Sequence, residues 1–163
     1  MNKTYLSLGS NRGDRMVNLE RAIKLLGEWA GNIMLVSSLY ETPPWRMADE
    51  TNFLNQVLLM ETKLDATELM DIIIQIELIM GRVRTTTGYE PRTIDVDILF
   101  YNEQIINNGR LTIPHPLIQL RRFILHPLNE IAPEFVHPVL KKSIGQLLLE
   151  CEDKSAIRKP VSK

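Results

Sequence analysis

The pattern of hydrophobic and polar residues predicts four strands and two long helices. Runs suited to strands lie at 5–8, 33–40, 53–61 and 91–101. Helical spacing of apolar residues follows a turn in which Asn11 or Asp14 can cap the first helix. A second helix follows Asp65, which forms a capping-box pattern with Glu68, and is expected to end at Gly81. A short closing helix is expected over 143–149, and from about residue 152 the chain is polar and expected to fray.

The order of these elements is strand, helix, strand, strand, helix, strand, which is typical of a split βαβ sandwich. We therefore expect an α+β fold of the ferredoxin-like βαββαβ kind. Its sheet should be mainly antiparallel, with helices packed on it and extra C-terminal elements. A length of 163 residues fits a single domain spanning 1–163. Because this fold hosts many activities, function has to be argued from individual residues.

Composition narrows the possible partners. The formal net charge is −1, so the molecule as a whole does not attract nucleic acid or an anionic membrane. No apolar run reaches the length of a bilayer span or a signal core, and we expect a cytoplasmic protein. Cys151 is the single cysteine and has no internal disulfide partner.

The clearest chemical signal lies in the strand at 91–101. Side chains alternate along a strand, so Asp95 and Asp97 are neighbours on one face. Two adjacent carboxylates repel, and a strand that keeps both needs a compensating cation. Mg²⁺ prefers carboxylate oxygens and is often shared with substrate phosphates, which predicts one or two Mg²⁺ ions beside a nucleotide. A solvated sheet face is the alternative. The core-facing residues of this strand are expected to be Ile94, Val96, Ile98 and Phe100.

Arginines flank this strand on both sides. From residue 82 to residue 122 all six basic residues are arginine, against four acidic residues. Guanidinium groups bind phosphate oxygens through paired hydrogen bonds and stay charged at any pH. Such a frame around two aspartates indicates Mg-ATP, with a solvated arginine face as the alternative. The six are Arg82, Arg84, Arg92, Arg110, Arg121 and Arg122.

Several separated segments share the order and spacing of one enzyme family. They include Leu8-Gly9-Ser10-Asn11, Phe53-Leu54-Asn55, Gly81-Arg82-Val83-Arg84, the run 91–98, Ile113-Pro114-His115-Pro116 and Arg121-Arg122-Phe123. Together they resemble the hydroxymethyldihydropterin pyrophosphokinase family of folate biosynthesis. The resemblance implies transfer of pyrophosphate from ATP, the co-substrate, to the hydroxymethyl group of 6-hydroxymethyl-7,8-dihydropterin, with two Mg²⁺ ions and AMP as the leaving product. We expect a monomer whose partners are these small molecules.

The resemblance also assigns roles to residues. It implies that the metal is held by Asp95 and Asp97, and that the catalytic groups are Arg82, Arg92, Asp95, Asp97 and His115. The ATP contacts that it implies are Glu77, Arg84, Arg92, Ile98, Arg110, Thr112, His115 and Arg121. The pterin contacts that it implies are Thr42, Pro43, Pro44, Trp45, Phe53, Asn55, Tyr89 and Phe123.

Physical reasons support some of these roles. The carboxamide of Asn55 offers the donor and acceptor that the edge of a pterin requires, although an asparagine bonded to a neighbouring loop is the alternative. The segment at 82–90 lacks periodicity and predicts a loop that closes over the site. We expect that loop to deliver Arg82 late in the reaction, whereas Arg92 stays beside the phosphates throughout.

Three positions depart from the family's usual residues. Ile74 stands where glutamine is common, with Gln75 one residue later. Tyr89 stands where tryptophan is common, so its stacking would rest on a smaller ring, and Pro116 stands where an aromatic residue is common.

Two other functions fit parts of the sequence. His115, His126 and His137 each precede proline at intervals of eleven residues, which raises a zinc hydrolase as an alternative, although the spacing matches no local zinc motif. The same fold hosts RNA-binding modules, but the sequence has no RNP-like aromatic string and its net charge is −1.

Overall fold

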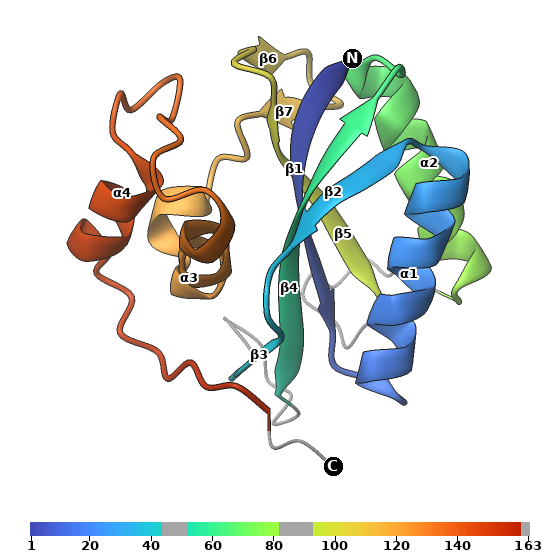
Figure 1. Ribbon diagram of the computed structural model, residues 1–163, viewed down its shortest axis with the longest axis horizontal. Coiled ribbons are helices and arrows are strands. Elements are labelled where there is room, and N and C mark those ends of the chain that lie inside the picture. Colours follow the sequence, from blue (N-terminus) through green and yellow to red (C-terminus); the bar gives the residue numbers. More distant parts are fainter. Residues whose placement is uncertain (44–51, 82–92, 161–163) are drawn as a thin grey trace.

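The computed structural model describes residues 1–43, 52–81 and 93–160, and it forms a sheet with helices on both faces (Figure 1). In chain order the elements are β1 (Asn2–Ser10), α1 (Arg15–Trp29), β2 (Asn32–Val36), β3 (Tyr40–Thr42), β4 (Phe53–Thr62), α2 (Ala66–Ile79), β5 (Asp95–Tyr101), β6 (Ile106–Asn107), β7 (Thr112–Ile113), the 3-10 helix η1 (Ile118–Leu120), α3 (Arg122–Ile131) and α4 (Ile144–Glu150).

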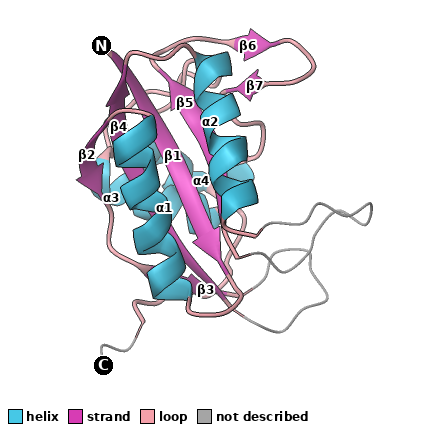
Figure 2. Cartoon of the chain, turned by 90° about the vertical axis from the view of Figure 1, so that its right-hand side faces the viewer, coloured by secondary structure: helices cyan, strands magenta, loops and turns pink. Residues whose placement is uncertain are grey.

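The sheet confirms the predicted α+β, ferredoxin-like arrangement. Its strands run in the order β2-β4-β1-β5, β3 also pairs with β4, and every pairing is antiparallel. Helices α1 and α2 lie side by side on one face, as Figure 2 shows, while α3 and α4 lie on the other. The short strands β6 and β7 form a separate hairpin.

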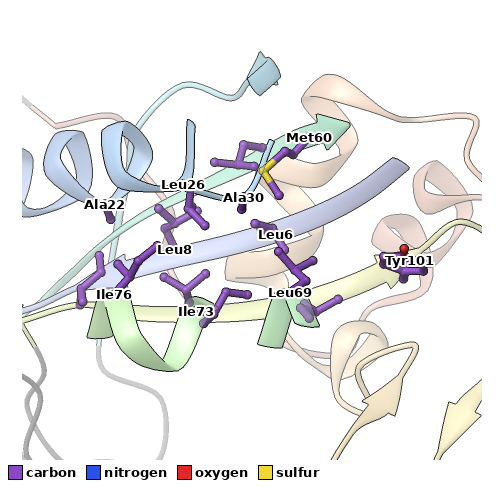
Figure 3. Close-up of a cluster of buried hydrophobic side chains, with 14 of the residues drawn as sticks. Leu6, Leu8, Ala22, Leu26, Ala30, Met60, Leu69, Ile73, Ile76 and Tyr101 are labelled. Atoms are coloured by element: carbon purple, nitrogen blue, oxygen red, sulfur yellow. The ribbon is translucent and has the colours of Figure 1, made fainter. Parts of the chain in front are cut away.

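The two long helices begin where the sequence predicts. The carboxylate of Asp14 accepts a hydrogen bond from the Val17 amide at 3.2 Å, and Asp65 and Glu68 form the expected capping box, with distances of 2.8 and 3.1 Å. Caps of this kind satisfy the first amides of a helix. Both helices bury apolar residues against the sheet, and Figure 3 shows Leu6, Leu26 and Ile73 in this cluster.

The strand β5 departs from simple alternation near its end. Leu6 of β1 pairs with Ile98, but the preceding residue Tyr5 pairs with Phe100, so Leu99 is an extra residue in β5. A β-bulge of this kind shifts the alternation by one residue. The expectation that Phe100 shares a face with Ile98 is therefore wrong, because Phe100 packs on the opposite face with α3 and α4.

The predicted strand at 33–40 is two strands, β2 and β3, that pair with β4 on either side of a break. At the break the Ser37 amide donates to the Val57 carbonyl at 2.8 Å, and the Ser37 hydroxyl accepts from the Val57 amide at 3.0 Å. A serine side chain that bonds to the backbone competes with the regular ladder. The edge therefore bends here without leaving the Val57 backbone unsatisfied.

For residues 153–158, the expectation that the tail frays is also wrong. Asp153 accepts a hydrogen bond from the first amide of α3, Arg122, at 3.1 Å. Further along, the backbone of Arg158 pairs with that of Glu41 in β3. Polar side chains that find backbone partners hold this segment, which composition alone could not indicate. Of the helices that the structure describes, not one has the length and apolar character needed to cross a membrane.

Candidate active site

The candidate site lies at one end of the sheet face that also carries α3. There three neighbouring strands bring Asn55 of β4, Gly9 of β1 and Asp95 of the edge strand β5 into register. A Cβ atom at Gly9 would lie 3.2 Å from the Asn55 side-chain oxygen, closer than almost all real contacts. A glycine inside a strand often marks such a close approach. Gly9 therefore leaves open space between the amide on one side and the carboxylate on the other.

A single pocket in this region brings together most of the described residues that the sequence assigned to the two substrates. Asp95 and Asp97 form its acidic side, as their shared strand face predicted. The first turn of α3 and the residues around it form the opposite wall. The assigned residues that line the pocket are Thr42, Pro43, Phe53, Asn55, Asp95, Asp97, Arg121 and Phe123.

One part of the pocket combines aromatic rings with a buried amide. Asn55 is 6% exposed and donates a hydrogen bond from Nδ2 to the Thr42 hydroxyl at 2.6 Å. This contact orients the amide so that its oxygen faces the side of Gly9. Phe53 and Phe123 provide apolar surface, and the Arg121 guanidinium carbon lies 5.5 Å from the centre of the Phe123 ring. A flat polar heterocycle could be held between these groups.

His115 is fixed beside the edge strand in a definite tautomer. Its amide donates to the Leu99 carbonyl at 3.0 Å, and its Nδ1 accepts from the Leu117 amide at 3.1 Å. A neutral imidazole whose Nδ1 accepts must carry its proton on Nε2. Burial, and then the charge of Arg121, lower the pKa of His115 to about 4, against an opposing effect of Asp95. His115 therefore presents a neutral N–H donor beside a cation at neutral pH.

Glu77 lies on the other side of the strand β5 from the pocket. It is 3% exposed, and its carboxylate accepts a hydrogen bond from the Val96 amide at 3.0 Å. Because pairing alternates along a strand, the Val96 and Ile98 backbone groups point away from β1 on the same side. The carboxylate thus fixes the peptide between the two aspartates.

Five of the described residues assigned to ATP do not line the pocket: His115 and Glu77, and also Ile98, Arg110 and Thr112. The Ile98 side chain is 3% exposed in the core under α2, so only its backbone can reach a ligand. Arg110, next to the β6–β7 hairpin, forms an exposed ion pair with Asp71 of α2. Thr112 is an exposed residue of β7. The predicted roles of Arg82, Arg84, Arg92, Tyr89, Pro44 and Trp45 fall on residues outside those that the structure describes.

The three histidines have separate surroundings. His126 packs edge-on against Tyr40, with ring centres 4.9 Å apart, and His137 packs against Phe100 at 5.4 Å. Within 1–43, 52–81 and 93–160, no three His, Cys, Asp or Glu side chains gather as a metal site would require. Nothing in the described residues therefore favours the zinc alternative.

Sequence reasoning missed several residues that line the pocket. They include Ser7, Gly9, Gln56, Val57 and Ile124. Gly9 could have been found, because a glycine at the end of a predicted strand and beside a polar strand neighbour suggests close approach. The others are ordinary strand and helix residues whose position depends on register alone.

The fold and the pocket define an α+β sandwich protein in which paired carboxylates and a guanidinium group line a pocket at the edge of the sheet, with the neutral imidazole of His115 near Arg121 and Asp95. A family model described as 7,8-dihydro-6-hydroxymethylpterin-pyrophosphokinase matches residues 5–133. The chain therefore belongs to the 6-hydroxymethyl-7,8-dihydropterin pyrophosphokinase family.

Individual relatives agree with the family match. The chain is 39% identical to a 2-amino-4-hydroxy-6-hydroxymethyldihydropteridine pyrophosphokinase of Aquifex aeolicus, over 90% of each chain. It is 41% identical to the protein of that name from Bacillus subtilis, over 82% of this chain and 80% of the relative. A solved structure of Plasmodium falciparum HPPK-DHPS with pteroate has the same fold, with a TM-score of 0.75 and 21% identity, over 91% of this chain and 42% of that one.

Proposed function

We propose that this protein transfers the pyrophosphoryl group of ATP to the hydroxymethyl group of 6-hydroxymethyl-7,8-dihydropterin, giving the pterin diphosphate and AMP in folate biosynthesis. Family membership carries the reaction class. The observation that carries the assignment to this site is the single pocket that joins the Asp95 and Asp97 carboxylates to the Asn55 amide. Such a pocket can hold a metal-bound phosphate and a heterocycle next to each other.

The carboxylates of Asp95 and Asp97 would hold Mg²⁺. The donor set fits, because both side chains leave the same strand face and Mg²⁺ takes oxygen ligands while keeping places for substrate phosphates and water. We propose two ions, since two carboxylates can share them with a triphosphate. When bound, Mg²⁺ neutralises charge on the bridging oxygens.

The pterin would bind in the part of the pocket around Asn55. The Asn55 oxygen can accept from the amino-pyrimidinone edge, while the Thr42 hydroxyl keeps the amide from rotating. Phe123 would cover one ring face, with Tyr89 proposed for the other. Pro43 and Phe53, with the proposed contacts Pro44 and Trp45, would complete the wall.

The triphosphate would cross the pocket toward β7 and η1. Arg121 supplies a permanent charge, and His115 supplies the Nε2 proton as a hydrogen-bond donor. The outward-facing Ile98 backbone is a candidate for the adenine edge. We propose Glu77, Arg84, Arg110 and Thr112 as further ATP contacts. Arg110 would have to leave Asp71 to take part.

Catalysis would come from positioning and charge stabilisation, because phosphoryl transfer needs little covalent work from the protein. Arg92 would contact the phosphates throughout, and Arg82 would join only as charge redistributes. Replacing Arg82 with alanine should then lower turnover without weakening ATP binding. Replacing Arg92 should lower both.

We further propose that 1–163 is a single domain that acts as a monomer in the cytoplasm. A second apolar cluster joins the C-terminal helices to the other face of the same sheet through Phe100, Leu128 and Ile144, which supports a single folding unit.

The direct test is to incubate the protein with ATP, Mg²⁺ and 6-hydroxymethyl-7,8-dihydropterin and to identify the nucleotide product. The proposal predicts AMP together with the pterin diphosphate, and no AMP when the pterin is omitted. ADP as the sole nucleotide product would contradict it. Glu150→Gln provides a control carboxylate variant outside the pocket, since Glu150 pairs with Lys142 and Gln146 in the C-terminal region.

A further inference from the structure

Two walls of the pocket come from segments that are far apart in the sequence. One wall is β3, whose last residue Thr42 holds the Asn55 amide. The other is the first turn of α3, which carries Phe123 next to Arg121. The distance between these walls sets the width of the part of the pocket around Asn55.

The C-terminal segment 153–158 touches both walls. At α3, the carboxylate of Asp153 accepts from the Arg122 amide at 3.1 Å, and the Arg122 guanidinium donates to the Ser155 carbonyl at 2.9 Å. At β3, the Glu41 amide donates to the Arg158 carbonyl at 2.7 Å, and the Arg158 amide donates back at 3.2 Å. In Figure 1 this last part of the chain runs from α4 to the end of β3.

The contact at β3 is more than a backbone pairing. The Arg158 guanidinium donates to one Glu41 oxygen at 2.8 and 3.2 Å, and the Arg15 guanidinium donates to the other at 2.7 Å. Arg15 also donates to the Asn52 carbonyl at 2.9 Å, immediately before Phe53 of the pocket. These arginine contacts, that of Arg158 first, lower the pKa of Glu41. Glu41, which directly precedes Thr42, thus links the tail to the start of α1.

We infer that residues 153–158 form a strap that positions the pterin part of the pocket, with Arg158 as its positioning residue. The strap lies beyond residues 5–133, which the family model matches. This inference rests on the proposed function, because it takes the part of the pocket around Asn55 to be the pterin subsite. Among the residues that the structure describes, the strap contacts Arg122 and Glu41 and none of those assigned to ATP, so its loss should act on the pterin rather than on ATP.

The test compares three variants of the full chain and one truncation. Arg158→Ala removes the ion pair with Glu41 but keeps the backbone pairing. Arg158→Lys restores a charge, and ending the chain after Glu152 removes the strap. Lys142→Ala is the matched control, because it breaks a 2.8 Å ion pair with Glu150 that lies in the same C-terminal region but away from both walls.

Arg158→Ala should raise the KM for the dihydropterin about twofold to fivefold, as expected for one exposed ion pair, with kcat and the KM for ATP unchanged. The lysine variant should recover most of this loss. Truncation removes several hydrogen bonds and should raise the same KM about tenfold or more. Lys142→Ala should change neither KM.

A second measurement separates this inference from the proposed function. Hydrogen exchange of the amides in 40–42 should be faster in Arg158→Ala than in the parent protein or in Lys142→Ala. A parent protein that makes no AMP would overturn the proposed function. The hydrogen exchange of the 40–42 amides would still show whether Arg158 holds β3 in place. Unchanged exchange, or equal rises in both KM values with a lower unfolding temperature, would overturn the strap as a positioning device.

Discussion

The two ends of one sheet face have the same ladder of strands but opposite chemistry. At one end Tyr5, Phe100 and Phe135 pack their rings together, with centres 4.6 to 6.3 Å apart, beneath α3 and α4. At the other end, Asp95 and Asp97 line a pocket. The apolar end stabilises the fold by burial. The acidic end carries two carboxylates on one strand face, which the proposed function assigns to Mg²⁺ rather than to stabilising the fold.

The largest effect on turnover is expected from substitutions at the acidic end. Asp97→Asn and Asp95→Asn should each lower turnover about a hundredfold or more, because a neutral amide neither offsets metal charge nor coordinates as strongly. The free energy of unfolding should stay the same or rise slightly in the metal-free protein, since repulsion is relieved. AMP formation and urea unfolding would measure the two effects. Near-normal turnover in either variant would remove the metal role.

The opposite result is expected at the apolar end. Phe100→Ala should lower the free energy of unfolding by about 3–5 kcal/mol, because Phe100 is 1% exposed and its removal leaves a cavity. Turnover per folded molecule should remain close to that of the parent below the unfolding transition. Urea titration with activity measured in the folded baseline would test this. A large fall in turnover with stability unchanged would show that the two ends are not separate.

One histidine lies near each end of this sheet face, and the pKa values of the two are lowered by different surroundings. Burial lowers the pKa of His137, which packs on Phe100, whereas burial and the nearby Arg121 lower the pKa of His115 to about 4. Since unfolded histidine is protonated below about 6.5, the unfolded state binds more protons between pH 6.5 and 4. The free energy of unfolding should therefore fall as the pH drops through that window.

The ligand distinguishes the two histidines. Addition of Mg²⁺ and a non-hydrolysable ATP analogue should raise the pKa of His115, because phosphate charge favours the protonated ring, and should leave that of His137 unchanged. Titration of the ring proton resonances by NMR would measure both. Equal responses at the two rings would count against phosphate binding beside His115.

The smallest effect separates the two substrates within the pocket. Asn55→Ala should raise the KM for the dihydropterin about tenfold, because a buried hydrogen bond to the ligand is lost, while the KM for ATP stays the same. Gln104→Ala, which removes an exposed amide outside the pocket, serves as the control. Equal losses for both substrates in Asn55→Ala would refute the separation.

The features that the sequence predicted correctly depend on residues close together in the chain. The capping box at Asp65, the period of the two helices and the shared face of Asp95 and Asp97 all follow from spacing of a few residues. The order of the elements predicted the ferredoxin-like fold class, the spacing of the aspartates predicted the acidic side of the pocket, and motif resemblance added Asn55 and Phe123.

What the sequence could not predict depends on partners that are distant in the chain. The bulge at Leu99 comes from its register with β1, and the break at Ser37 from a hydroxyl that bonds to β4. The tail is ordered because Asp153 and Arg158 meet Arg122 and Glu41, which are 31 and 117 residues away. Burial of Ile98 likewise limits it to backbone contacts, a restriction that a motif match does not reveal.

The central claim is that the metal and the phosphates bind at the acidic end of this face. Backbone amide NMR of the protein with Mn²⁺ and a non-hydrolysable ATP analogue tests it directly, since the paramagnetic ion broadens nearby resonances. The account predicts the strongest broadening at Gly9, Asp95 and Asp97, weaker broadening at Phe135 and His137, and loss of the effect in Asp97→Asn. Broadening strongest at the apolar end, or unchanged in Asp97→Asn, would contradict it.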